Sequence, residues 1–183
     1  MSRYFQVIIA IIMLVVLLPI LIPILILVGF DGHSPFFIQQ RVGRYGRLFN
    51  LYKIRTMVAK SEVIGSYQTQ KNDSRITYVG SFVRRFNLDE LLQLFNVIKG
   101  DMNLVGPRPD VVEQLHLYEE RDLALRLSVR PGITGLAQVS GRSALTFNER
   151  LELDKFYVRK RTSYLDMNIL IKTIFPTSKN LQN

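Results

Sequence analysis

The chain has 183 residues, with 24 Lys and Arg against 15 Asp and Glu, and a formal net charge of +9 at pH 7. This positive excess suits anionic partners such as nucleic acid, acidic lipid headgroups or phosphorylated small molecules. The absence of Cys excludes disulfides and thiolate metal sites, and only two His argue against a zinc site. Carboxylates are therefore the main candidates for catalysis.

The first predicted element is an apolar run over residues 7–28, interrupted only by Pro19 and Pro23. The run is long enough to cross a bilayer, for which about 20 apolar residues suffice. Proline lacks an N–H and clashes with the preceding turn, so we expect the helix to break near Pro19. The half before it, residues 7–18, would reach only about 18 Å into a hydrocarbon core of about 30 Å. Two alternatives follow: a kinked crossing helix, and a re-entrant helix that returns to the same face.

Residues 1–30 are thus predicted to be a membrane element and residues 31–183 one catalytic domain. Several basic residues and no acidic one lie between residues 41 and 60. The positive-inside rule places this side of the membrane in the cytoplasm.

The domain begins with two predicted strands, residues 36–40 and 48–54, joined as a hairpin by the linker VGRYGR. Residues 60–78 are polar and indicate a loop. Helices are expected at residues 81–86, 88–98, 110–127 (as one helix or two), 147–161 and 164–175. Gly100 is placed to end the second of these helices, and RPGITGLAQVSGR indicates a loop with a short extended core. The pattern predicts an α+β fold dominated by helices, with amphipathic helices at the membrane interface.

Asp89 and Glu90 form the most informative pair in the domain, because they are adjacent carboxylates at a predicted helix start. Neighbouring residues on a helix do not share a face, so the two carboxylates are expected to do different jobs. The alternative is simple capping of the helix, with Asn87 or Asp89 as the cap.

Arginines beside turn residues are the second indication of chemistry. Arg suits bidentate phosphate recognition, although any single Arg can be a surface cation. The candidates are Arg84, Arg85, Arg108, Arg130 and Arg142, with Lys53, Arg55 and Thr56 at the end of the second strand. A carboxylate with Mg²⁺ and several arginines suits phosphoryl transfer, in which Asp can be the nucleophile. Nucleic-acid binding is the competing interpretation, but the aromatic residues do not interleave with the basic ones as a stacking platform.

Three segments in order, LYKIRTM, LDELLQLFNVIKGDMNLVGPRP and RPGITGLAQVSGR, resemble the monotopic phosphoglycosyl transferases, also called bacterial sugar transferases. The resemblance covers nearly the whole chain and suggests the minimal form of that family. It implies transfer of a phospho-sugar from a UDP-sugar to a polyprenol phosphate (undecaprenyl phosphate), with release of UMP, as the first membrane step of glycan assembly. It also implies a protein on the cytoplasmic face of the bacterial inner membrane, in contact with lipid and possible downstream glycosyltransferases, and not with nucleic acid.

The resemblance assigns roles residue by residue. Asp89 looks like the nucleophile that takes the sugar phosphate covalently and lies near Mg²⁺, and Glu90 looks like its acidic partner in acid–base work or metal geometry. Arg108 looks like a phosphate contact. Weaker candidates for diphosphate or uridine contacts are Arg85, Arg130, Arg142, Lys53 and Arg55. Pro19 matches the helix-breaking proline that makes the membrane segment re-entrant.

The chain departs from the family pattern at Gln6, Leu18, Leu92 and Asn103, where relatives often carry Asp, Ser, Pro and Ser. The first two departures concern the stabilisation of the helix break, for which Pro23 is a possible compensation. The catalytic pair is intact. Two other functions stay open: a membrane-anchored binding protein without turnover, and a phosphatase or pyrophosphatase in which water resolves the aspartyl intermediate.

Overall fold

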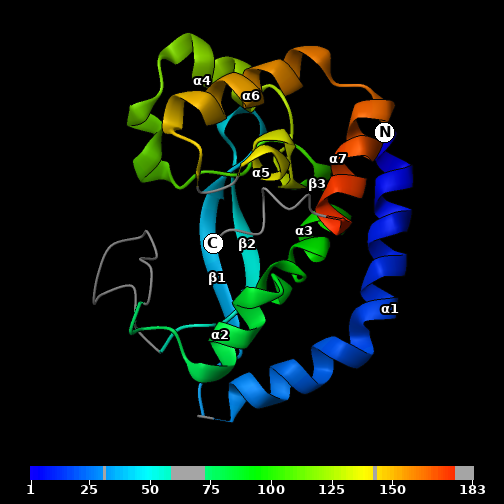
Figure 1. Ribbon diagram of the computed structural model, residues 1–183, viewed down its shortest axis with the longest axis vertical. Helices are drawn as coiled ribbons and strands as arrows, with labels where there is room; N and C mark the ends of the chain where they lie inside the picture. Colours follow the sequence, from blue (N-terminus) through cyan, green and yellow to red (C-terminus); the bar gives the residue numbers. More distant parts are fainter. Residues whose placement is uncertain (31, 59–72, 142–143, 176–183) are drawn as a thin grey trace.

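The computed structural model describes residues 1–30, 32–58, 73–141 and 144–175. It confirms a helix-dominated α+β fold with a small hairpin and an N-terminal apolar helix (Figure 1). In chain order the elements are α1 (Arg3–Gly29), β1 (Phe36–Val42), η1 (Arg44–Gly46), β2 (Leu48–Ile54), α2 (Tyr78–Arg85), η2 (Leu88–Glu90), α3 (Gln93–Lys99), β3 (Asn103–Val105), η3 (Val112–Leu117), α4 (Glu120–Leu127), β4 (Gly132–Thr134), α5 (Leu136–Ser140), α6 (Phe147–Lys160) and α7 (Ser163–Ile174). Most of the predicted loop at 60–78 lies outside the described residues.

The predicted hairpin is confirmed, because β1 and β2 pair antiparallel from Phe36 opposite Ile54 to Val42 opposite Leu48. Along β1 the exposed residues alternate with partly covered ones, as expected for a sheet with one covered face. Asn96 of α3, which is fully buried, fastens the outer edge of β2. Its side chain accepts from the Tyr52 N–H (3.1 Å) and donates to the Asn50 carbonyl (2.7 Å).

A second sheet, of the short parallel strands β3 and β4, was not predicted. The segment RPGITGLAQVSGR was expected to be a loop with an extended core, and it holds β4 and also the helix α5. The two strands approach so closely at Gly132 that a Cβ there would lie 2.0 Å from the Gly106 nitrogen. Only glycine allows this approach, which places the segment after β3 directly beside β4.

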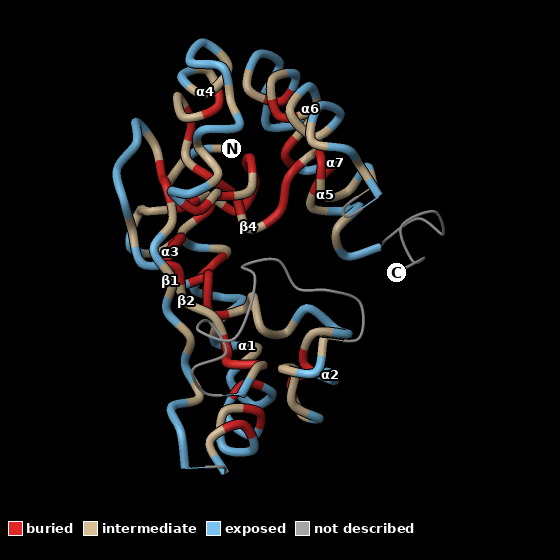
Figure 2. Tube along the Cα trace, turned by 90° about the vertical axis from the view of Figure 1, so that its left-hand side faces the viewer, coloured by how far each residue is buried: buried red, intermediate tan, exposed pale blue. Residues whose placement is uncertain are grey.

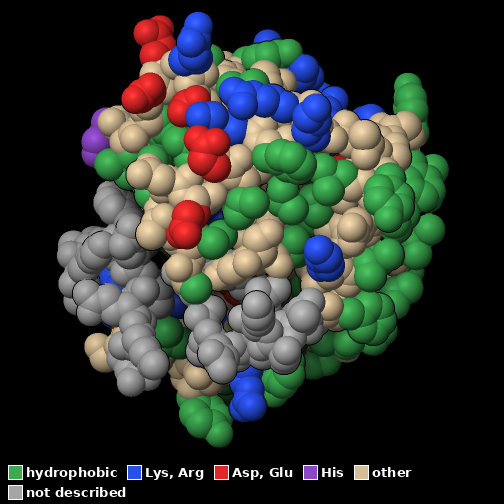
Figure 3. Space-filling model, turned by 45° about the horizontal axis from the view of Figure 1, so that its top comes forward, with side chains coloured by type: hydrophobic (Ala, Val, Ile, Leu, Met, Phe, Trp, Pro, Cys, Tyr) green, Lys and Arg blue, Asp and Glu red, His purple; other side chains and the backbone are tan. Residues whose placement is uncertain are grey.

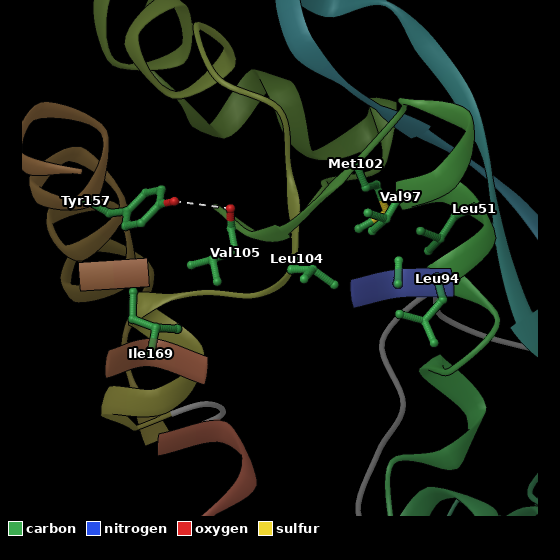
Figure 4. Close-up of a cluster of buried hydrophobic side chains, with 9 residues drawn as sticks. Leu51, Leu94, Val97, Met102, Leu104, Val105, Tyr157 and Ile169 are labelled. Atoms are coloured by element: carbon green, nitrogen blue, oxygen red, sulfur yellow. Dashed lines mark hydrogen bonds between the residues drawn. The ribbon is translucent and has the colours of Figure 1, made fainter. Parts of the chain in front are cut away.

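The core lies where the hairpin, α3, β3, α6 and α7 meet. Leu51, Leu94 and Met102 pack in one cluster with Ile169, and the hydroxyl of Tyr157 donates to the Val105 carbonyl at 3.1 Å (Figure 4). Figure 2 shows the buried residues gathered along the inside of the molecule, with exposed positions along its rim. This packing joins elements from the start and the end of the chain.

The predicted break in the N-terminal helix is a bend. Helix α1 stays helical across Pro19 and Pro23, and Figure 1 shows it changing direction partway along. Each proline removes one helical hydrogen bond, which permits the bend without ending the helix. Before the bend Ala10 packs on the core cluster, and after it Leu21 and other apolar residues pack on a second cluster with Ile54, Val83 and Leu92.

The other side of α1 is apolar and exposed. Exposed residues include Ile8, Ile12, Val15, Val16, Ile22 and Leu27. Figure 3 shows hydrophobic side chains covering the side of the molecule along which α1 runs. The helix is long and apolar enough to cross a membrane by length and composition.

The helix predicted over 88–98 is instead a 3₁₀ turn, η2, followed by α3. Asn87 has a left-handed backbone conformation (φ 53°), so the chain turns sharply before Asp89 and Glu90. Asn87 occupies the N-cap position of η2, as the capping alternative predicted, but its side chain makes no capping hydrogen bond, and Asp89 lies inside the turn. Gly100 ends α3 as predicted, with φ 100° and its N–H on the Asn96 and Val97 carbonyls.

Candidate active site

Four charged residues from three elements meet around η2. Lys53 comes from β2, Asp89 and Glu90 lie in η2, and Arg108 follows β3. Asn96 fixes β2 against α3, which holds Lys53 beside the turn. Sequence separation hides this arrangement, because Lys53 and Arg108 lie 37 and 18 residues from Glu90.

Glu90 is the centre of the cluster. Its carboxylate accepts two hydrogen bonds from Arg108, at 2.5 Å from Nη2 and 3.2 Å from Nη1, and one from Lys53 Nζ at 3.2 Å. Burial by itself raises the pKa of Glu90, but the charges and hydrogen bonds of Arg108 and Lys53 outweigh it and hold that pKa below its usual value. Glu90 is thus a fixed anion that orients two cations.

Asp89 has a different environment. Its side chain is 13% exposed and makes no hydrogen bond with any other described residue, and Lys53 Nζ lies 3.9 Å from Oδ2. Burial raises the pKa of this carboxyl, and the charges of Lys53, Arg84 and Arg108 only partly oppose the rise. Neither oxygen accepts a hydrogen bond from another of the residues that the structure describes. The two carboxylates therefore have different surroundings, and the different roles that their adjacency predicted stay a prediction.

The cations around the carboxylate pair lie close enough to one another for the charge of one to affect the pKa of another. Burial lowers the pKa of Lys53, and Arg108 adds to that effect while Glu90 and Asp89 oppose it. Arg41 of β1 donates to the Pro109 carbonyl at 3.1 Å, and burial together with the charge of Arg108 lowers its pKa to about 10. An anion entering beside Asp89 would meet cations that the two carboxylates do not fully neutralise.

The two adjacent arginines before the carboxylate pair, Arg84 and Arg85, differ in their surroundings. Arg84, rather than Arg85, is turned toward the pair: Arg84 interacts electrostatically with Asp89 and donates to Thr56 Oγ1 at 2.7 Å. Arg85 is exposed and lies over the Phe86 ring. A role for Arg85 in binding stays a prediction.

Arg55 and Arg130 lie apart from the pair, and Arg142 lies outside the described residues. Arg55 is buried and donates to the carbonyls of Ser34 (2.7 Å) and Val28 (2.8 Å), so it holds the end of α1. Arg130 donates to the Gly100 carbonyl at 2.8 Å. Their contact with diphosphate or uridine stays a prediction.

Sequence reasoning missed Arg126, which supports Arg108 from behind. This buried side chain of α4 donates to the Arg108 carbonyl, to Asp110 and, at 2.9 Å, to Asp154 of α6. Tyr118 adds a hydrogen bond to Asp110 at 2.9 Å. Arg126 sits among other charged residues on an ordinary amphipathic helix, so no local pattern distinguishes it.

The carboxylates of the site can be compared with the ligands that Mg²⁺ requires. The described residues contain no group of three His, Cys, Asp or Glu side chains that could hold a metal by themselves. Mg²⁺ often binds through one or two carboxylates plus substrate phosphates, however, and keeps its remaining positions for water. Asp89, whose oxygens accept no hydrogen bond from the other described residues, fits that mode, whereas the Glu90 oxygens are taken by Arg108 and Lys53.

Comparison with known proteins identifies the class. The family described as bacterial sugar transferase matches residues 1–180, so the chain belongs to this family. It is 41% identical over 188 residues to the undecaprenyl-phosphate galactose phosphotransferase of Salmonella typhimurium, covering 94% of this chain and 39% of that protein. It is also 38% identical over 189 residues to the exopolysaccharide production protein ExoY of Rhizobium meliloti, covering 94% of this chain and 83% of that protein.

A third similar protein is the UDP-N-acetylgalactosamine-undecaprenyl-phosphate N-acetylgalactosaminephosphotransferase of Aeromonas hydrophila, 36% identical over 183 residues, or 95% of this chain and 43% of that protein. The chain therefore spans less than half the length of several curated relatives that it matches. ExoY, by contrast, is of similar length.

Proposed function

We propose that this protein is a phosphoglycosyl transferase that moves a sugar 1-phosphate from a UDP-sugar to undecaprenyl phosphate. The observation that carries the proposal is the different hydrogen bonding of the two adjacent carboxylates in η2. Glu90 is tied by Arg108 and Lys53, while the neighbouring carboxylate of Asp89 has no hydrogen bond to another described residue. The names of the Salmonella and Aeromonas relatives support this acceptor and this type of reaction.

In the proposed first step an oxygen of Asp89 attacks the phosphorus that bears the sugar. The bond from this phosphorus to the bridging oxygen of the diphosphate breaks, and UMP leaves with the electron pair. In the second step an oxygen of undecaprenyl phosphate attacks the same phosphorus, and Asp89 leaves as a carboxylate. The products are UMP and undecaprenyl-diphosphate-sugar, and the reaction follows ping-pong kinetics.

The chain's own cations would act on the phosphates. Arg108 and Lys53 are held by Glu90 at the side of Asp89, where negative charge develops on the transferred group. The lowered pKa of Glu90 favours this positioning role over proton transfer. Bound Mg²⁺, held by Asp89 and phosphate oxygens, would supply further charge neutralisation.

The test is UMP release by detergent-purified protein with Mg²⁺, undecaprenyl phosphate and a panel of UDP-sugars. We expect one donor to give UMP and Asp89→Asn to abolish its release, while Glu120→Gln, at an exposed position of α4, keeps it. Incubation with donor alone should add the mass of the sugar phosphate to the intact protein but not to Asp89→Asn. Turnover without the lipid acceptor would instead favour a phosphatase, and folded protein inactive on every donor would favour a binding protein.

We also propose that α1 is re-entrant and holds the domain on the cytoplasmic face. Both ends of α1 are fastened to the same domain: Arg3 donates to the Met102 carbonyl at 2.9 Å, and Arg55 donates to the Val28 carbonyl at 2.8 Å. A helix crossing the bilayer along its full length would draw parts of this charged domain into lipid.

Because the chain has no Cys, single cysteines report the topology cleanly. Ser2→Cys and Ser34→Cys flank α1 and are exposed. Both should react with a membrane-impermeant maleimide in inverted vesicles, and neither should react in spheroplasts. Labelling of the two positions from opposite sides would show a crossing helix.

A further inference from the structure

A second basic site lies away from η2, in a cavity of about 410 Å³ between the start of α1 and the junction of α6 and α7. Four arginines from four separate parts of the chain line it: Arg3, Arg44, Arg130 and Arg161. None of the four charged residues around η2 belongs to its lining. The cavity is therefore distinct from the candidate active site.

Backbone carbonyls, not carboxylates, hold three of these four arginines. Arg3 donates to Met102 at 2.9 Å, and Arg44 and Arg130 donate to carbonyls of Ser128 and Gly100 at 2.8 Å. Among the described residues, none of the four arginines forms an ion pair with a carboxylate. A carbonyl orients a guanidinium but leaves its full charge in place.

The single carboxylate among the described lining residues does not neutralise them. Asp166 accepts from the Met1 amino group at 2.8 Å and from the Tyr157 hydroxyl at 2.7 Å. Burial lowers the pKa of Arg3, and the like charge of Arg130 lowers it further, while the charge of Asp101 opposes the change. Several guanidinium groups lining one cavity suit a phosphate, which accepts their paired hydrogen bonds.

The position of the cavity indicates the source of the phosphate. The cavity lies at the end of α1, whose outer face is apolar, and beside α7, which exposes Tyr164 (81%) and Ile171 (52%). Figure 1 shows α7 next to the N-terminal part of α1. If the outer face of α1 lies in lipid, the cavity sits at the depth of the headgroups.

We propose that this cavity binds the phosphate of an anionic lipid headgroup and so fixes the N-terminal end of α1 at the membrane surface. The proposal rests on the placement of α1 in lipid, not on the transferase activity. Arg44 and Arg161 are the residues to change, because Arg3 and Arg130 hold together the start of α1 and the turn after α3.

The test measures the thermal midpoint of the purified protein in neutral detergent, with soluble short-chain phosphatidylglycerol or inorganic phosphate as the probe. A ligand that binds only the folded state stabilises it, so phosphatidylglycerol at a hundred times its Kd should raise Tm by about 5–10 °C. The double variant Arg44→Gln/Arg161→Gln should lose most of this shift. Arg121→Gln/Arg159→Gln removes the same charge at exposed positions outside the lining and should keep it.

Support requires that phosphatidylglycerol act at a concentration at least about tenfold below that of inorganic phosphate, a difference of about 1.4 kcal/mol. Equal effects of both probes would overturn the lipid assignment in favour of a free phosphate. No shift, or the same shift in both double variants, would overturn the site itself. These readouts do not depend on UMP release, so they separate this proposal from the proposed function.

Discussion

Replacement of Arg126 by Met tests whether the hydrogen bonds of Arg126 stabilise the folded protein and fix the segment that carries Arg108. The Arg126 side chain is 4% exposed and contacts Asp110, Asp154 and the Arg108 carbonyl. Methionine has a similar volume but removes the hydrogen bonds that Arg126 donates to two carboxylates and one carbonyl, so that Asp110 keeps only the one from Tyr118 among the described residues. Breaking a buried ion pair from one side costs about 3–5 kcal/mol. For a chain of this size, that loss corresponds to a fall in Tm of about 6–20 °C.

Thermal unfolding in detergent, followed by far-UV circular dichroism, measures this fall. A second variant, Arg126→Met with Asp110→Asn and Asp154→Asn, removes the unpaired charges and should recover part of the lost Tm. At a temperature well below Tm, Arg126→Met should also release UMP more slowly than wild type, because the Arg108 segment is no longer fixed. A Tm within about 2 °C of wild type, which is less than 1 kcal/mol, would refute the reasoning.

Three further changes test other parts of the structure. Glu90→Gln weakens the charge-assisted hydrogen bonds to both cations, worth about 1.5–3 kcal/mol, so UMP release should fall about 10- to 100-fold; unchanged kinetics would contradict the positioning role. Gly80→Ala places a Cβ 2.1 Å from the Thr56 carbonyl oxygen and should lower Tm, whereas Gly29→Ala meets nothing closer than 3.9 Å and should leave Tm nearly unchanged. Glu149 closes the capping box of α6, and the hydrogen bonds that it accepts lower its pKa. Its contribution is therefore present above the unfolded pKa, so Glu149→Gln should lower Tm at pH 7 but progressively less below pH 4.5; a difference independent of pH would exclude this linkage.

Local signals in the sequence determined the elements that build the site. Two short strand-like runs joined by the glycine-containing linker VGRYGR predicted the hairpin, helical spacing predicted α6 and α7, and Gly100 marked the end of α3. The adjacency of Asp89 and Glu90 also predicted that they act separately. These properties depend on the backbone over a few residues, so they can be inferred without knowing what packs nearby.

The tertiary structure alone decided which groups face one another. The left-handed turn at Asn87 is followed by a 3₁₀ turn where a regular helix start was expected. In this turn Glu90 accepts hydrogen bonds from Arg108 and Lys53, whereas Asp89 has no hydrogen bond among the described residues. Spacing along the sequence cannot show such partners, because packing of distant elements chooses them.

The same holds for the arginines and for α1. Positions beside a turn or at a strand end, together with the family resemblance, marked Arg55, Arg85 and Arg130 as similar candidates, yet burial and contacts differ among the three. Arg126, which no motif marks, instead supports the Arg108 segment. Pro19 predicted a break in α1, but the helix continues through it with a bend. The inner face of α1 packs on one hydrophobic cluster of the domain before the bend and on a second cluster after it. The role of a guanidinium group or an apolar helix face depends on the residues that pack against it. Those residues come from distant parts of the sequence, so only the folded structure identifies them.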